Sequence, residues 1–330
     1  MTTHILVPLD GSPFGEQAIP AALGLALRDR AAIELVLVQE NVEWPASIQP
    51  LLARYPDARA EALLAGETYL DMVASRIREQ GVAEVVQTLL DGPVVETLAG
   101  HIDDRRPDLV VMTTHGRGGM SRAWLGSVAD ALVRRVAVPV MLVRPYDGMV
   151  PPPQAPMRPL PWLTRIAVPL DGSAVAEEAI EPALATSGTN GVELSLLRVV
   201  PPPVTYLRPA YLQDLSASIL AEMETDAARY LERVADRIAR PGVTVRTVVF
   251  IDESAARGIL AYAGGGAVDM IAMTTHGRRG LARLVIGSVA DKVVRGAGVP
   301  VLLVRPSATR RLEASASEVE VMSVAALPPL

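Results

Sequence analysis

Residues that could bind a phosphate-bearing ligand occur in two groups, and each group is present twice. Asp10 and Asp171 each end a short apolar run and are followed by Gly-Ser. Gly126-Ser127 and Gly287-Ser288 each stand where a helix is expected to begin. A carboxylate at a strand end can accept hydrogen bonds from an amino group, a ribose hydroxyl or a backbone N–H. The free N–H groups of a helix start favour an anion. The alternative for each Asp is that it only closes its own turn.

The segment before each helix start strengthens the phosphate interpretation. Gly116 follows an apolar run directly after His115, and Gly277 stands in the same place after His276. A glycine there lets backbone N–H groups approach a phosphate closely. The neighbouring Arg117 and Arg278 would add positive charge, which is our inference from the residues alone. The competing interpretation is a structural turn followed by an ordinary helix cap.

Composition excludes several classes of chemistry. The chain has 330 residues and no cysteine, so disulfides, thiolate metal sites and cysteine nucleophiles are excluded. Its one lysine, Lys292, lies in Ala-Asp-Lys-Val-Val, which rules out a Walker-type phosphate loop. The four histidines are too scattered in the sequence to predict a metal cluster, and those at 115 and 276 are interpreted as loop-positioning residues. No pair of base and nucleophile is identifiable, so no catalytic residue is predicted.

Charge and hydropathy favour a cytoplasmic protein. The net charge is −6, which disfavours binding to nucleic acid or to an anionic membrane. The apolar runs are far shorter than the ~20 residues that span a bilayer. The first residues carry no basic segment followed by a signal-like apolar run.

The chain contains an internal duplication. Val7-Pro8-Leu9-Asp10-Gly11-Ser12 recurs as Val168-Pro169-Leu170-Asp171-Gly172-Ser173, an offset of 171 − 10 = 161. The same offset relates the Thr-Thr-His-Gly-Arg blocks, the Gly-Ser-Val-Ala-Asp blocks and the closing Val-Pro-Val blocks. We therefore expect a first domain at 1–145, a proline-rich linker at 146–163, a second domain at 164–306 and a tail at 307–330.

Strand and helix patterns alternate through each copy. In the first copy the expected strands are 4–9, 33–39, 84–90, 109–113 and 140–144. Helices are expected between them. This alternation predicts an α/β fold of two repeated, doubly wound domains, each with a five-stranded parallel sheet covered by helices on both faces. In such sheets ligands bind beyond the carboxyl ends of the strands, where the strand order reverses.

The fifth strands are expected to join the two domains. Residues 138–143 and 299–304 would each form an exposed apolar edge, which is an aggregation hazard unless it is paired. Two like edges related by a pseudo-two-fold axis can pair antiparallel. The sequence therefore predicts an intrachain pseudo-dimer, and further association into a homo-oligomer is expected.

These motifs resemble the universal stress protein family. The resemblance rests on Val-Pro-Leu-Asp-Gly-Ser at the end of the first strand and on the late block Thr-His-Gly-x9-Gly-Ser followed by Val-Pro-Val. It covers both copies, roughly 2–145 and 164–306. The nucleotide-binding branch of the family has Gly-x2-Gly-x9-Gly-Ser/Thr, and its first glycine falls here on Thr113 and Thr274. The resemblance implies an adenine-nucleotide-binding, Rossmann-like fold.

The resemblance also implies roles for particular residues. Asp10 and Asp171 would contact the adenosine. Glu40 and, with a shift of about two residues, Val199 would face the adenine through backbone groups. The remaining residues expected at the two nucleotide sites are Thr113, Gly116, Arg117, Gly126 and Ser127 in the first copy, and Thr274, Gly277, Arg278, Gly287 and Ser288 in the second.

Three functions remain to be distinguished. The first is a stress-response module that binds ATP, with or without Mg²⁺, for sensing or regulation. The second is a scaffold that binds no nucleotide, which threonine in place of the first glycine favours. The third is a slow ATPase. The copies also differ where Gly92 is replaced by Glu253, which would place a carboxylate near the second anion site.

Overall fold

The computed structural model describes residues 2–40, 47, 57–115, 125–145, 157–161, 163–188, 191–203, 210–276 and 286–307. The elements of the first half are β1 (His4–Leu9), the 3₁₀ helix η1 (Gly15–Ala18), α1 (Ile19–Asp29), β2 (Ala32–Gln39), α3 (Ala58–Arg78), β3 (Val85–Asp91), α4 (Val94–Arg105), β4 (Leu109–Thr113), α5 (Ser127–Arg135) and β5 (Val140–Val143). Those of the second half are β6 (Arg165–Pro169), α6 (Ala174–Glu177), α7 (Ile180–Ser187), β7 (Val192–Val200), α8 (Ala210–Ile238), β8 (Val243–Ile251), α9 (Ala255–Tyr262), the π-helical turn η2 (Ala263–Ala267), β9 (Met270–Thr274), α10 (Ser288–Gly296) and β10 (Val301–Val304).

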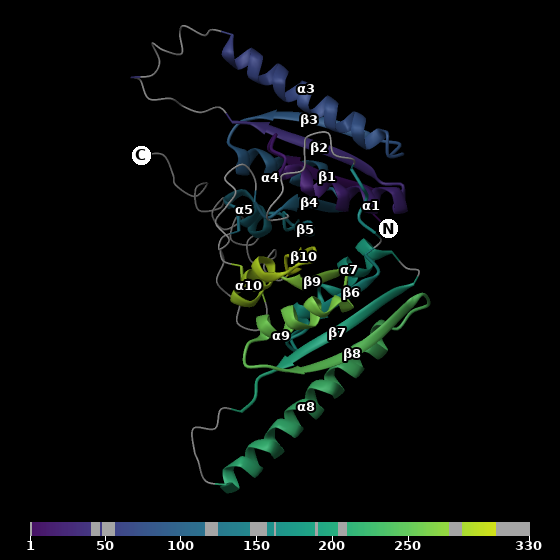
Figure 1. The fold of residues 1–330 in the computed structure, drawn as a ribbon, viewed down its shortest axis with the longest axis vertical. Coiled ribbons are helices and arrows are strands. Elements are labelled where there is room, and N and C mark those ends of the chain that lie inside the picture. The colour runs from purple at the N-terminus through teal and green to yellow at the C-terminus, as the bar shows by residue number, and fades with distance from the viewer. Residues whose placement is uncertain are drawn as a thin grey trace, which may run out of the picture.

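The strands of both halves form one sheet. Its order is β3-β2-β1-β4-β5-β10-β9-β6-β7-β8. Within each half every neighbouring pair is parallel. Figure 1 shows the two halves one above the other, with α3 along one outer end of the sheet and α8 along the other. The predicted α/β fold with two repeated, doubly wound units is therefore confirmed.

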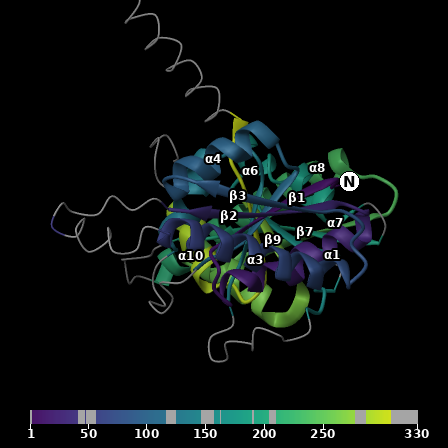
Figure 2. The same ribbon diagram turned by 90° about the horizontal axis from the view of Figure 1, so that it is seen from above.

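Two apolar layers sandwich this sheet. On one face α1, α3, α7 and α8 pack against strand side chains such as Val7 and Leu194. On the other face α4, α5, α9 and α10 pack against the alternate strand residues, such as Leu6 and Leu303. Figure 2 places α4 and α1 on opposite sides of the sheet. Because side chains of a strand alternate between faces, strands that are apolar throughout suit a sheet that is covered on both sides.

The halves meet where β5 pairs antiparallel with β10, with Leu142 opposite Val301. In the β4–β5 ladder the N–H of Val110 donates to Pro139 and that of Thr114 donates to Val143. Because strand N–H groups alternate between neighbours, the N–H of Leu142 points to β10. The predicted pairing of the fifth strands within the chain is thus confirmed, and both apolar layers continue across it.

Two arginines close this seam reciprocally. Arg144 Nη1 donates to the carbonyl of Arg295 at 3.0 Å, and Arg305 Nη1 donates to the carbonyl of Arg135 at 2.7 Å. Each guanidinium, at the end of a fifth strand, therefore meets the carboxyl end of the last helix in the other half. A cation is favoured at that end of a helix because the last carbonyls are unpaired and carry partial negative charge.

The described part of the proline-rich linker packs against the first half. The Leu160 N–H donates to the carbonyl of Pro20 at 2.8 Å. Met157 and Leu163 are buried. Gly24 of α1 makes this contact possible, since a Cβ there would lie 2.5 Å from the Leu160 carbonyl oxygen. Burial of these apolar side chains favours the docked linker.

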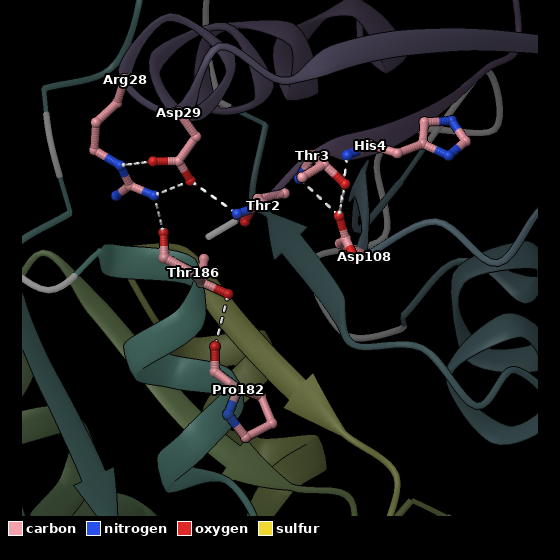
Figure 3. A network of polar contacts seen from close by, with 8 residues as sticks. All are labelled: Thr2, Thr3, His4, Arg28, Asp29, Asp108, Pro182 and Thr186. Carbon is pink, nitrogen blue, oxygen red and sulfur yellow. Dashed lines mark hydrogen bonds and ion pairs between the residues drawn. The ribbon is translucent and has the colours of Figure 1, made fainter.

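A polar network joins α1 to α7 beside the linker (Figure 3). The Arg28 guanidinium donates to both oxygens of Asp29, at 2.8 and 2.7 Å, and to the carbonyl of Thr186 at 2.6 Å. Asp29 also accepts from the N–H of Thr2. Burial alone would raise the pKa of Asp29, but the hydrogen bonds from Arg28 and Thr2 outweigh it and hold the pKa below its usual value. The network therefore keeps a charged pair in a largely buried contact between the halves.

Gly24→Ala is expected to destabilise the protein by roughly 1–3 kcal/mol, because the new methyl group would push the linker backbone off α1. Gly100→Ala in α4 is the matched control, since nothing lies within 4 Å of a Cβ at that position. That control should be neutral or stabilising by up to about 1 kcal/mol. Guanidinium unfolding followed by circular dichroism measures both. Equal stability of the two variants would show that the linker is not held against α1.

Candidate functional site

A cavity of about 680 Å³ lies at the carboxyl ends of β1, β2 and β4. β1 stands between β2 and β4 in the sheet, so the strand order reverses there. The cavity lies on the sheet face that α4 and α5 cover. The described residues that line it are Pro8, Leu9, Asp10, Gly15, Val36, Leu37, Val38, Gln39, Glu40, Val94, Leu98, Met112, Thr113, Thr114, His115, Leu125, Gly126, Ser127, Val128 and Ala129. Five of the residues expected at the first nucleotide site are thus brought together here.

Asp10 both lines this cavity and holds its own turn. Its Oδ1 accepts from the N–H of Ser12 at 3.0 Å and from the Ser12 hydroxyl at 2.7 Å. Asp171 Oδ1 makes the same two contacts with Ser173, at 2.9 and 2.6 Å. A Cβ at Gly15 would lie 2.6 Å from Asp10 Oδ1, so a larger residue there would displace the carboxylate. The turn-closing role left open by the sequence is therefore real at both positions.

The residues expected at the ends of the second strands are not equivalent to each other. His4 pairs with Ala32, and Arg165 pairs with Glu193, so both partners are displaced by the same 161 residues. The two-residue shift that was expected between the two copies at the ends of their second strands is therefore wrong. Glu40 lines the first cavity and corresponds to Pro201. Val199 corresponds to Val38 and instead lines a cavity beside α8.

Thr113 and Thr274 are held by the loops that follow their strands. The Thr113 hydroxyl donates to the carbonyl of His115 at 2.8 Å, and the Thr274 hydroxyl donates to that of His276 at 2.7 Å. Each threonine replaces the first glycine of the family pattern. Its hydroxyl proton is committed to the turn, so it can offer a ligand only an acceptor oxygen.

Gly126 and Gly287 fit closely against the same loops. The Gly126 N–H donates to the carbonyl of Thr114 at 2.8 Å, and a Cβ at Gly126 would lie 2.9 Å from that oxygen. Gly287 repeats both features against Thr275, at 2.8 and 3.0 Å. The glycine is thus required by the close approach of α5 to the end of β4. Its own N–H is not available to a phosphate.

The free donors at this end of α5 come from the next residues. Gly126 is the residue that precedes the helix, and no side chain caps it. Ser127 is exposed and is the first helical residue. The backbone N–H groups of Ser127, Val128 and Ala129 have no partner within the helix, and all three residues line the cavity. Ser288 has the same position and exposure in α10. Gly116, Arg117, Gly277 and Arg278 lie outside the described residues.

His115 lines the first cavity and has one ring nitrogen without a hydrogen-bond partner among the described residues. Its Nδ1 lies 3.0 Å from the Thr114 hydroxyl. Its Nε2 is buried and has no hydrogen-bond partner in the described structure, and His276 Nε2 is in the same situation. A buried ring nitrogen without a partner is costly, so a ligand atom that bonded it would be favoured. The charged groups among the described lining residues are Asp10 and Glu40, which leaves the helix start as the main attraction for an anion there.

A second polar cluster lies near the other end of these strands, where no sequence motif had predicted one. Buried Glu34 of β2 accepts from His4 Nε2 at 2.9 Å, from His101 Nε2 at 2.8 Å and from the Thr88 hydroxyl at 2.8 Å. The Arg105 guanidinium lies 3.6 Å away. Histidines that are distant in sequence thus converge on one carboxylate. Among the described residues, however, no group of side chains is arranged to hold a metal ion.

This cluster predicts a specific acid sensitivity. Burial alone would raise the pKa of Glu34, but the hydrogen bonds from His4, His101 and Thr88 outweigh it and lower the pKa from 4.5 to about 2. A lowered pKa stabilises the fold above pH 4.5, and the contribution is lost as the pH falls toward 2. The loss amounts to about 3 kcal/mol.

Glu34→Gln should be less stable than the wild type at pH 7, and its unfolding free energy should fall less between pH 5 and pH 2.5. Denaturant unfolding at each pH measures this difference. Ser195 occupies the corresponding position in the second half and bonds Tyr262, so Ser195→Ala should leave the acid slope unchanged. If the unfolding free energies of the wild type and Glu34→Gln fall equally between pH 5 and pH 2.5, Glu34 is not the source of the acid sensitivity.

The model of the universal stress protein family matches residues 1–144 and 163–305, which is most of the chain. The chain belongs to this family. A universal stress protein of Mycobacterium tuberculosis is 28% identical over 316 residues, which cover 91% of this chain and 94% of that protein. A second one from the same species is 33% identical over 201 residues, and the match spans about three-fifths of both proteins, 61% and 62%.

Solved structures agree on the fold. A universal stress protein from Archaeoglobus fulgidus superposes with a TM-score of 0.55 at 19% identity, covering 92% of this chain and 96% of that one. The two segments that match the family model confirm the family and the tandem arrangement expected from the sequence. In the described part of the chain, none of the helices is both long and apolar enough to cross a membrane.

Proposed function

We propose that the cavity at the ends of β1 and β4 binds an adenine nucleotide, with ATP as the expected ligand, and that the protein is a cytoplasmic binding module of the stress response. The observation that carries this proposal is the start of α5. Its free N–H groups and the exposed Ser127 hydroxyl border a cavity of about 680 Å³, a volume typical of small-ligand sites. A phosphate at that position would be bonded by the helix N-terminus.

The rest of the cavity suits a nucleoside. Val36, Val38, Leu98 and Met112 provide an apolar surface on which a purine ring would be buried. The strand end at Glu40 offers backbone groups to the edge of the base. Asp10 would accept hydrogen bonds from ribose hydroxyls, and His115, which also lines the cavity, would be a further hydrogen-bonding residue. ATP would supply the charged phosphates, and Mg²⁺ would enter with the nucleotide rather than through a protein metal site.

The second half would carry a weaker site. Asp171, Thr274, Gly287 and Ser288 repeat the first half, but Glu253 stands where the first half has Gly92. The Glu253 carboxylate is exposed and lies 4.0 Å from the Arg257 guanidinium, which is already engaged with Asp252. A carboxylate that is only partly neutralised near an anion site lowers affinity.

Calorimetric titration of the full chain with ATP tests these proposals. We expect two sites, with the tighter one weakened by Ser127→Ala and the weaker one by Ser288→Ala, each by roughly threefold to tenfold for one lost hydrogen bond. No heat at millimolar ATP would refute binding. A turnover faster than about one per second, near the lower end of ordinary enzymes, would refute the binding-module proposal in favour of an ATPase.

The alternative is a scaffold that binds no nucleotide. Thr113 favours it, because its hydroxyl is committed to the turn and its side chain is larger than the glycine of the binding branch. The same titration decides between the two.

A further inference from the structure

A second cavity, of about 530 Å³, lies between β7 and α8. It is on the sheet face that α7 and α8 cover, opposite the face of α4 and α5 that borders the proposed nucleotide cavity. Figure 1 shows α8 running along β7 and β8 at one end of the molecule. The described residues that line it are Gly172, Arg198, Val199, Val200, Pro201, Met223, Asp226, Ala227, Arg229, Tyr230 and Arg233. We refer to it as the α8 cavity.

Positive charge predominates in the α8 cavity. Arg198 comes from β7, and its guanidinium lies 5.1 Å from the centre of the Tyr230 ring. Arg229 and Arg233 come from successive turns of α8. Asp226 is the one acidic side chain among the described lining residues, and it forms an ion pair with Arg229 at 3.2 Å. Guanidinium groups therefore outnumber carboxylates among the described residues of this cavity.

The first half shows what this region looks like without the charges. At the offset of 161 residues, Arg198 corresponds to Leu37, Arg229 to Thr68 and Arg233 to Met72. Leu37 is buried, as an apolar strand residue under a helix is expected to be. The second half therefore places arginines where the first half has two apolar residues and a threonine.

The surrounding framework is the same in both halves, so the offset is sound there. Arg76 Nη1 bonds Glu16 at 2.8 Å, and Tyr69 lies two turns earlier on α3. Arg237 likewise forms an ion pair with Glu177, and the Tyr230 hydroxyl donates to that same carboxylate at 2.8 Å. Because the Glu, Tyr and Arg frame is kept, the three arginines are a local difference and not a consequence of a different helix register.

We propose that the α8 cavity binds a small phosphate-bearing anion. A guanidinium is a planar fork of donors that matches phosphate oxygens, and several guanidinium groups around one cavity can bond the same phosphate. Pro201 and Met223 offer apolar surface to the carbon part of such a ligand. This proposal is independent of nucleotide binding by the first cavity, since the two cavities lie on opposite faces of the sheet.

The test uses the full chain labelled with ¹³C at the methionine methyl groups and pyrophosphate as the probe. Met223 lines the α8 cavity, whereas Met112 lines the proposed nucleotide cavity, so their methyl signals report on the two sites separately. We expect pyrophosphate to shift the Met223 signal in a saturable way. Inorganic phosphate as a second probe should act at higher concentration.

Two variants make the result specific. Arg198→Leu installs the residue of the first half and should raise the dissociation constant at Met223 at least tenfold, and Arg233→Gln, at an exposed position, should do the same. Arg246→Gln on β8 is the control for net charge and should leave it unchanged. A Met223 signal that does not move, one that moves equally in all variants, or a response confined to Met112 would overturn the proposal.

Discussion

Leu142→Pro is expected to lower the unfolding free energy by about 3 kcal/mol or more and to separate the unfolding of the two halves. The N–H of Leu142 points to β10, opposite Val301, so a proline removes a hydrogen bond at the seam while leaving the β4–β5 bonds in place. The wild type should unfold in one transition, because both apolar layers run through the seam.

Gln87→Pro is the matched control. β3 is an edge strand, and the N–H groups of Ile33 and Gly92 donate to Glu84 and Gln39 respectively. The alternation of this ladder leaves the N–H of Gln87 pointing away from β2, so a proline there removes no sheet hydrogen bond. Calorimetry and circular dichroism compare the two variants. A single transition at the wild-type temperature in Leu142→Pro would show that the seam does not couple the halves.

Gly126→Val should weaken the tighter nucleotide site by at least roughly thirtyfold. A Cβ at Gly126 would lie 2.9 Å from the Thr114 carbonyl oxygen, so the start of α5 must move away from β4. The free N–H groups of the first helical turn would move with it. Loss of about 2 kcal/mol of hydrogen bonding corresponds to roughly a thirtyfold weaker affinity.

Gly287→Val is the matched variant, because its Cβ would meet the Thr275 carbonyl oxygen at 3.0 Å in the second half. It should remove the weaker site and leave the tighter one. Titration with ATP, together with circular dichroism to verify folding, measures both variants. An unchanged tighter site in folded Gly126→Val would exclude the start of α5 as the phosphate site.

Local patterns were enough to predict the fold. The apolar runs at β1 and β4 have the same bounds in the structure as in the sequence prediction, because a buried parallel strand bounded by turn residues has clear limits. The apolar edges expected at residues 138–143 and 299–304 predicted that these two strands pair with each other, as β5 and β10 do. The helix expected between the strands at 4–9 and 33–39 is instead the 3₁₀ turn η1 followed by α1, where Pro20 stands near the helix start.

What the sequence could not predict depends on contacts between distant segments. Nothing in the pattern around His4 or His101 indicates that both meet Glu34. The hydroxyl of Thr113 turns to the His115 carbonyl only because the loop folds back, so its availability to a ribose could not be read from residue type. The docking of Leu160 on α1 likewise depends on the small size of Gly24 in the folded helix.

The most direct test of nucleotide binding is mass spectrometry of the small molecules released when the purified full chain is denatured. Wild-type protein should release an adenine nucleotide, and the Gly126→Val, Gly287→Val double variant should release none. Calorimetric titration of any nucleotide-free preparation with ATP completes the measurement. Release of no nucleotide from the wild type, together with no heat of binding at millimolar ATP, would contradict the account.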